Sequence, residues 1–335
     1  MSDILPKVAV IGTGGTISGV GRDRLDLYEY GTSGRFMHIE ELLATVPELA
    51  QVAEVVPVRY ANVASTAIDP THWLALLRLI NATHAAHPDL AGIVVTHGTA
   101  ALEETAYFLN LAVRAPVPVV VVGAMRPSSA LGADGGMNLL NGVRVAACPK
   151  SRGMGVLVLL NDEINAARDV TKTSNYRLNT FVSRDVGVLG SADGDEVAFY
   201  RKPLRRAAPD TEFAVKGLAA LPRVDIIPAY AGADGVFVQA AVAAGAKGLV
   251  SSGLPSGTPP PAQKAALKEA AAAGIVVVQS SRSGSGRVID SKAAVRDAGF
   301  LAADSLTPQK ARILLMLALT VTQDPYEIRC IFAEY

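Results

Sequence analysis

The feature that most constrains the fold is an alternation between short, continuous apolar runs and longer amphipathic stretches. Runs rich in valine and isoleucine cover residues 8–12, 92–98, 118–124 and 155–162. Amphipathic stretches cover residues 38–46, 70–87, 101–113 and 134–147. Strands that are buried on both faces are continuous hydrophobic runs, and they occur in parallel sheets whose connections are helices. We therefore predict an N-terminal α/β domain with a parallel sheet that is covered on both faces.

The same alternation resumes after a change of composition near residue 200. Residues 201–213 are basic, contain proline and have few apolar side chains, which is typical of an exposed linker. Thr307 and Pro308 are predicted to begin the last helix, as N-cap and first helical residue. The further predicted strands are 224–230, 248–253 and 275–281, and the helices are 235–245, 261–274 and 306–322. We predict two α/β domains, 1–200 and 223–335, joined by a linker over 201–222.

Charge and composition limit the possible partners. The chain has 31 Lys and Arg and 31 Asp and Glu, so its zero net charge gives no electrostatic argument for binding nucleic acid or an anionic membrane. No apolar run reaches the roughly 18 residues that span a bilayer, and the N-terminal residues lack the features of a signal peptide. Cys148 and Cys330 are the only cysteines, and the five histidines show no metal-ligand spacing. We expect a cytoplasmic protein without a metal.

A glycine-rich turn, GTGGTISGVG (12–21), follows the first predicted strand. It fails the dinucleotide fingerprint because Ile17 stands at the third glycine position, and it lacks the Gly-Lys-Ser/Thr ending of a phosphate loop. The turn is predicted to expose Thr13 and Thr16 at the carboxyl end of a strand, where open parallel sheets bind ligands. A tight turn without a function is the alternative.

Three more strand ends carry side chains that can do chemistry. Thr99 stands at a predicted helix start, where backbone N–H groups favour a developing oxyanion, although a threonine there is more often an N-cap. Lys172 follows the run 155–162, and in a dry pocket its lowered pKa would let it act as a base; a solvated loop lysine is the alternative. The loop after 118–124 holds Arg126, Ser128 and Asp134, which either line a pocket or hold the loop. Hydroxyls and a lysine without a histidine base indicate nucleophilic catalysis by threonine.

These segments together resemble the bacterial-type asparaginase and glutaminase-asparaginase family. The resemblance rests on GTGGTISG, VVTHGTAALEETAYFL, VVGAMRPSSALGADGGMNLLNG, NDEINAARDVTKT and the C-terminal LTPQKARILLMLALTVTQDPYEIRCIF. It spans nearly the whole chain, in order and with similar spacing. It implies a larger N-terminal domain with a flavodoxin-like sheet, a smaller C-terminal α/β domain, and a homotetramer built from tight dimers. It also implies active sites at domain and subunit contacts, with no cofactor.

The resemblance also implies roles for individual side chains. Thr16 matches the usual nucleophile of the family, and Thr99 matches its second catalytic threonine. Lys172 matches the lysine that pairs with the second threonine. Tyr30 is the best match for the mobile lid tyrosine, with Tyr28 as the alternative.

The substrate-binding residues depart from the family pattern. Ser65 matches the serine that holds the substrate's α-carboxylate, but Thr66 stands where a glutamine is usual. Ala100 replaces the aspartate that binds the α-ammonium and completes the lysine–threonine triad. Ser256 stands in the place of an asparagine from the C-terminal domain. No acid clearly fills the place of the usual glutamate, and Asp290 is the nearest candidate.

These departures predict an asparaginase-like amidohydrolase for a small carboxamide or cyclic amide that lacks a free α-ammonium. A buried ammonium without partners costs several kcal/mol, and removing one partner of a desolvated charged pair costs roughly 2–5 kcal/mol. Thr16 or Thr99 would attack the carbonyl, and Lys172 or Tyr30 would transfer the proton. Backbone N–H groups near Gly14, Gly15 and Gly98 would stabilise the oxyanion. The alternatives are an ordinary L-asparaginase or glutaminase, and a non-catalytic protein that binds a small acid.

Overall fold

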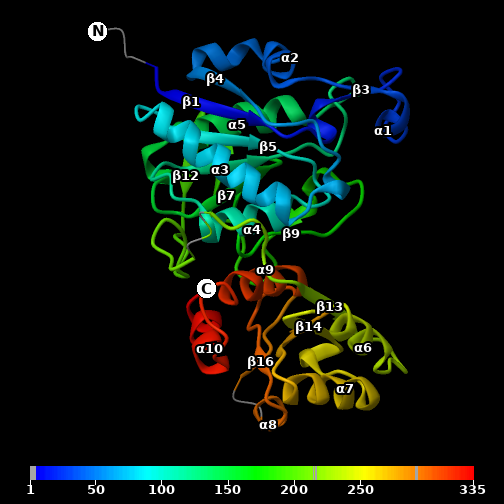
Figure 1. Cartoon of the computed structure of the whole chain (residues 1–335). Helices are drawn as coiled ribbons and strands as arrows, with labels where there is room; N and C mark the ends of the chain where they lie inside the picture. The colour runs from blue at the N-terminus through cyan, green and yellow to red at the C-terminus, as the bar shows by residue number, and fades with distance from the viewer. Residues whose placement is uncertain (1–4, 214, 216, 291–292) are drawn as a thin grey trace. The chain divides into compact units, whose positions relative to one another are not determined.

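Residues 5–213, 215, 217–290 and 293–335 are described by the computed structural model. The chain forms two units, Met1–Asp210 and Thr211–Tyr335 (Figure 1). Part of the segment predicted as an exposed linker is buried, because Phe213 is fully buried and its ring centroid lies 5.0 Å from that of Tyr335. The domain limits that we inferred from the sequence stay a prediction.

The first unit is built on a mostly parallel sheet with the strand order β12-β11-β8-β7-β6-β5-β1-β4. The strands are β1 (Lys7–Gly12), β4 (Glu54–Arg59), β5 (Gly92–Thr96), β6 (Val119–Val122), β7 (Val156–Leu160), β8 (Glu163–Ala166), β11 (Gly190–Asp193) and β12 (Glu196–Phe199). The five strands β4, β1, β5, β6 and β7 are parallel to one another. The strands β8, β11 and β12 each run antiparallel to the strand before them in the sheet. Asn161 and Asp162 both have positive φ, and they form the tight turn that reverses the chain between β7 and β8.

The parallel strands have the order of a flavodoxin-like sheet. Across the sheet these strands lie in the order β4-β1-β5-β6-β7. If the five are numbered 1 to 5 along the chain, this is the order 2-1-3-4-5. The chain passes from β1 to β4 on one side and then returns to β5 on the other side of β1. The loops that follow β1 and β5 therefore flank the point where the strand order reverses, and such sheets bind ligands there.

Helices cover both faces of this sheet (Figure 1). They are α2 (Ile39–Ala44) and α5 (Gly135–Ala147) on one face, and α3 (Pro70–Ala86) and α4 (Leu102–Ala112) on the other. Val8, Val10 and Val94 pack in one core with Leu42 and Leu139 of α2 and α5. Because side chains alternate along a strand, the intervening strand residues face α3 and α4, and these are buried as well. Burial on both faces explains the continuous apolar runs.

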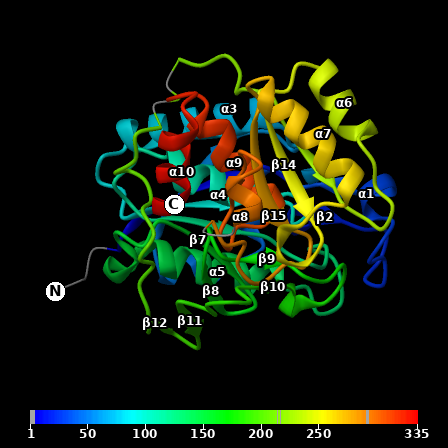
Figure 2. The same ribbon diagram turned by 90° about the horizontal axis from the view of Figure 1, so that it is seen from below.

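The second unit has a parallel sheet in the order β13-β14-β15-β16. Its strands are β13 (Val224–Pro228), β14 (Gly248–Gly253), β15 (Val276–Ser281) and β16 (Leu301–Ala302), and its longer helices are α6 (Val236–Ala243), α7 (Pro261–Ala272), α9 (Pro308–Ala318) and α10 (Pro325–Glu334). Figure 2 shows α6 and α7 on one side of β14 and β15, and α9 and α10 on the other. Thr307 and Pro308 begin α9 as predicted, although the Thr307 side chain makes no capping hydrogen bond.

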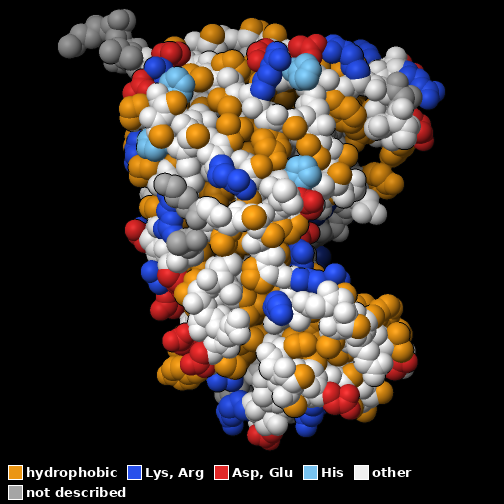
Figure 3. Space-filling view, viewed as in Figure 1, with side chains coloured by type: hydrophobic (Ala, Val, Ile, Leu, Met, Phe, Trp, Pro, Cys, Tyr) orange, Lys and Arg blue, Asp and Glu red, His pale blue; other side chains and the backbone are white. Residues whose placement is uncertain are grey.

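Several short elements complete the fold. They are β2 (Gly19–Val20), β3 (Arg35–Phe36), β9 (Thr171–Lys172), β10 (Phe181–Val182), α1 (Tyr30–Ser33), α8 (Ala293–Arg296), and the 3-10 helices η1 (Thr16–Ser18), η2 (Pro47–Gln51), η3 (Ser65–Ala67), η4 (Pro149–Ser151), η5 (Leu178–Thr180) and η6 (Pro255–Gly257). On the face shown in Figure 3, basic and acidic side chains are interspersed. Within the described residues, no helix is both long enough and apolar enough to span a membrane.

Candidate active site

Thr16 begins η1, directly after the turn that ends β1. Its Oγ1 lies 2.7 Å from the hydroxyl oxygen of Tyr30, so either hydroxyl can donate a hydrogen bond to the other. Thr13 is predicted to be exposed by the same turn, but it is 2% exposed and donates to the carbonyl of Thr96 at 2.8 Å. The turn therefore presents Thr16, and not Thr13, to a second hydroxyl.

The two tyrosines that match the expected lid residue have different surroundings. Tyr30 begins α1, and its ring packs on Gly19, where an added Cβ would lie 2.8 Å from the ring. Tyr28 packs edge-on against the ring of Tyr176, with 5.3 Å between the ring centroids. Only Tyr30 of this pair is hydrogen-bonded to Thr16 in the structure. This geometry favours Tyr30 as the lid tyrosine, and its catalytic role stays a prediction.

A second hydrogen-bonded pair consists of Thr99 and Lys172. The Lys172 Nζ donates to the Oγ1 of Thr99 at 2.7 Å, and Thr99 is buried. The alternative function of Thr99 as a helix cap is wrong, because Ala101 is the N-cap of α4. The pKa of Lys172 is lowered because burial desolvates the ammonium, although the negative charge of Glu103 opposes this shift. A lysine with a lowered pKa can more readily accept a proton from a hydroxyl.

Lys172 lies on a strand that the sequence pattern did not predict. The strand that we expected over 155–162 is followed first by the antiparallel strand β8, and only then by β9, which carries Lys172. β9 pairs with β10, with Lys172 opposite Phe181. The lysine is therefore held by a short antiparallel ribbon rather than by the end of a parallel strand.

Glu103 is a site residue that we did not identify from the sequence. It lies in the first turn of α4, it is 8% exposed, and its Oε2 accepts the backbone N–H of Lys172 at 3.2 Å. A carboxylate one turn into the helix that follows Thr99 is the signal that could have found it. A glutamate at this position also fits a helix N-terminus, where acidic residues are favourable, so the sequence alone gives it an ordinary structural explanation.

The turns that precede Thr16 and Thr99 pack closely against each other. A Cβ on Gly15 would lie 2.2 Å from the Cα of Gly98, and a Cβ on Gly98 would lie 2.6 Å from that of Ser65. The N–H of Ala100 donates to Ser65 Oγ at 3.3 Å. Because Thr16 and Thr99 directly follow these two glycines in the chain, their backbones lie next to each other at the reversal point of the sheet.

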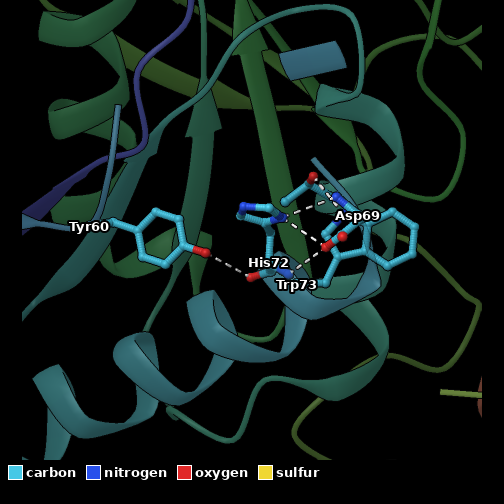
Figure 4. Close-up of polar contacts among 5 residues, drawn as sticks. Tyr60, Asp69, His72 and Trp73 are labelled. Atoms are coloured by element: carbon cyan, nitrogen blue, oxygen red, sulfur yellow. Dashed lines mark hydrogen bonds and ion pairs between the residues drawn. The ribbon is translucent and has the colours of Figure 1, made fainter. Parts of the chain in front are cut away.

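The segment that carries Ser65 is fixed by a polar cluster at the start of α3 (Figure 4). The Asp69 carboxylate caps the helix by accepting from the backbone N–H of His72 at 3.0 Å and lies 2.8 Å from its ring Nδ1. The Tyr60 hydroxyl donates to the carbonyl of His72 at 3.3 Å, and Trp73 Nε1 donates to a threonine hydroxyl of α4 at 3.0 Å. These contacts tie the two ends of the segment that contains Ser65, at Tyr60 and Asp69, to α3, and tie α3 to α4.

The loop after β6 is held in place by Asp134. The carboxylate of Asp134 accepts the backbone N–H groups of Met125 and Arg126, each at 2.9 Å. The Arg126 side chain donates to the carbonyl of Gly132 at 2.7 Å, and the backbone N–H of Ser128 donates to Gly19. Of the two explanations for these residues, the structure favours the one in which they hold the loop.

The other predicted substrate-binding residues lie in different parts of the chain. Thr66 lies beside Ser65 in η3 and is exposed, as is Ala100. Ser256 lies in the second unit, within η6, and has a positive φ of 60°. Asp290 also lies in the second unit and forms an ion pair with Arg329 at 3.2 Å. The parts that these side chains play in a site stay predictions. The described residues contain no cluster of three or more His, Cys, Asp or Glu side chains suited to a metal.

Comparison with known proteins gives consistent matches along both units. Residues 7–205 match the family model of the asparaginase N-terminal domain, and residues 223–332 match that of the glutaminase/asparaginase C-terminal domain. The chain is 44% identical to L-asparaginase 2 of Bacillus subtilis, over 99% of this chain and 87% of that protein. It is 40% identical to a glutaminase-asparaginase of Pseudomonas fluorescens, over 99% and 91%. A crystal structure of a probable cytoplasmic L-asparaginase from Campylobacter jejuni superposes with a TM-score of 0.93 at 38% identity, covering 98% of this chain and all of that one.

Proposed function

Since the chain belongs to the glutaminase/asparaginase family of amidohydrolases, which act on non-peptide C–N bonds, we propose that it hydrolyses a small carboxamide or cyclic amide lacking a free α-ammonium. The observation that carries this proposal is the 2.7 Å contact between Lys172 Nζ and Thr99 Oγ1, beside the methyl group of Ala100. This contact supports a role for the pair in the chemistry, whereas the residue next to Thr99 has no charge.

The chemistry follows from the Thr16–Tyr30 and Thr99–Lys172 pairs. Thr16 or Thr99 attacks the amide carbonyl with its oxygen. Thr99 loses its proton to neutral Lys172, whereas Thr16 passes its proton to the Tyr30 hydroxyl as that hydroxyl gives its own proton to the leaving nitrogen. Backbone N–H groups at the turn around Gly98 stabilise the negative oxygen that forms. The C–N bond then breaks, the nitrogen leaves with the returned proton, and water hydrolyses the resulting ester to a carboxylic acid and free threonine.

The substrate restriction follows from the lack of a charged side chain at Ala100, in the turn after β5. Ala100 is exposed, and its N–H contacts Ser65 Oγ, so this corner offers a hydroxyl, an amide and a methyl group. Such groups can hold a carboxylate or a carbonyl, but they do not balance the charge of an ammonium ion. If a bound substrate excludes water from this corner, the lack of one charged partner costs roughly 2–5 kcal/mol, so free asparagine should be a poor substrate.

An ordinary L-asparaginase or glutaminase is the second candidate. It is favoured by the relatives, which are named as L-asparaginases and glutaminase-asparaginases at 40–44% identity over 99% of this chain. The two candidates share the nucleophile and differ in the group that the substrate carries next to its carboxylate. We also propose, from the resemblance alone, a homotetramer and a cytoplasmic location.

Replacement of each threonine tests the proposed chemistry. We expect Thr16→Ala and Thr99→Ala each to lower kcat by roughly 1,000-fold or more, because loss of a nucleophile or its activating partner removes most of the catalysis. Ammonia release from succinamic acid and from L-asparagine measures this loss. Thr45→Ala is the matched control, since its hydroxyl bonds only to the end of α2, at Leu42. Full activity in both site variants would contradict the mechanism.

A further inference from the structure

The position of Lys172 depends on a buried carboxylate from another element. Glu103 Oε2 accepts the backbone N–H of Lys172 at 3.2 Å, and the side chain of the same lysine donates to Thr99 at 2.7 Å. Glu103 belongs to α4 and Lys172 to β9, which is 69 residues further along the chain. The contact therefore fixes β9 against the helix that begins beside the reactive threonine.

Glu103 is also the charged group that acts most directly on the lysine. Burial lowers the pKa of Lys172, and the negative charge of Glu103 acts in the opposite direction and raises it. Two neighbours of the pair carry no charge: Phe181 lies opposite Lys172 on β10, and Ala100 follows Thr99. Asp169, on the turn before β9, forms an ion pair with Arg168 at 3.1 Å.

We propose that Glu103 is a positioning residue of this amidohydrolase site: its carboxylate holds Lys172 against Thr99 and supplies the negative charge that balances the lysine ammonium. The proposal rests on the proposed function, in which Lys172 takes a proton from a threonine. It deepens that function by identifying a carboxylate that remains at the lysine although Ala100 provides none.

Glu103 can act on Lys172 in two ways, through its position and through its charge. As a hydrogen-bond acceptor, it determines where the backbone of β9 lies and so whether Nζ reaches Thr99. As an anion, it stabilises the charged form of Lys172, which delays the loss of the proton as the pH rises. Burial acts in the opposite direction, and the pKa of Lys172 reflects the balance between the two.

Glu103→Gln removes the charge but keeps an acceptor oxygen on a side chain of the same length. We expect the titration midpoint of Lys172 to move to lower pH, because the anion that stabilises the ammonium is gone. NMR of protein labelled at the lysine Cε measures this midpoint directly, and Lys172→Arg identifies the signal. The rising limb of the kcat–pH profile for ammonia release should move in the same direction. A purely structural role would lower the rate at every pH and leave both midpoints unchanged.

Glu104→Gln is the matched control, because it neutralises the adjacent carboxylate of the same helix, and we expect it to leave the titration midpoint of Lys172 unchanged. Glu103→Ala removes the acceptor as well, and we expect kcat to fall about 10- to 100-fold, which corresponds to the loss of a hydrogen bond to a charged group. An unchanged Lys172 midpoint in Glu103→Gln would overturn the inference. If the midpoint moves while Lys172→Arg keeps full activity, the role of Glu103 stands and the proposed proton transfer is wrong.

Discussion

Ala100 and Glu103 lie three residues apart and have opposite consequences for charge at the site. Ala100 presents a methyl group and an N–H that contacts Ser65, so nothing in its side chain can bind a cation. Glu103 is charged, but its carboxylate is already bonded to the backbone of Lys172. A carboxylate is thus available to the enzyme's own lysine, and the residue after Thr99 has none to offer to a substrate ammonium.

His97, two residues before Thr99, gives the fold a dependence on pH. It is 1% exposed, its Nδ1–H donates to the Gly98 carbonyl at 2.8 Å, and burial lowers its pKa to about 4. The unfolded chain takes up this proton near pH 6.5, and the folded chain does so only near pH 4. The free energy of unfolding should therefore fall by about 3 kcal/mol as the pH drops through this window.

Urea unfolding between pH 7 and pH 4 measures this effect. His97→Gln has no titratable group at this position. Between pH 7 and pH 4, its free energy of unfolding should therefore fall by about 3 kcal/mol less than that of the natural chain, even though the variant is less stable overall. If the free energy of unfolding changes with pH equally in the variant and the natural chain, His97 is not the group that causes the pH dependence.

The two turns that carry Thr16 and Thr99 form one structural element of the site, and their contact is testable. Gly15 has a φ of +86°, and a Cβ there would lie 2.2 Å from the backbone of Gly98. We expect Gly15→Ala to lower the free energy of unfolding by about 2–5 kcal/mol through strain and overpacking, and to abolish most activity by separating the turns. Gly136→Ala in α5 is the control, since its nearest neighbour would lie at 3.7 Å. Equal stability of the two variants in thermal unfolding would contradict this account of the contact.

The elements that the sequence predicted best are the ones buried on both faces. Periodic apolar patterns located β1, β5, β6 and β7 and the helices between them, because burial alone determines those residues. The pattern missed β4, an edge strand that contains Pro57, and it missed the short strands β8, β11 and β12. Edge strands tolerate proline and polar residues, so β4 and β12 leave a weak signal in the sequence. β8 and β11 lie inside the sheet, but each has only four residues, which gives little periodicity to detect.

At the scale of the whole molecule, the candidate site could be predicted only in part. The motifs identified Thr16, Thr99 and Lys172, and the structure brings Lys172 to Thr99 and Tyr30 to Thr16. Glu103 could not be assigned to the site because its contact depends on how α4 packs against β9, and no local pattern encodes that packing. The family membership and the two-unit fold were predicted correctly. The substrate, the tetramer and the role of Ser256 remain predictions.

The central claim is that this family site lacks the charge needed to accept an α-ammonium, and a comparison of two substrates tests it most directly. Succinamic acid is asparagine without its α-ammonium, so kcat/KM should favour succinamic acid in the natural chain. Ala100→Asp should shift the ratio of the two kcat/KM values toward L-asparagine by about 30-fold or more, the equivalent of one restored charged partner. A natural chain that prefers L-asparagine, with a ratio that Ala100→Asp leaves unchanged, would contradict the claim.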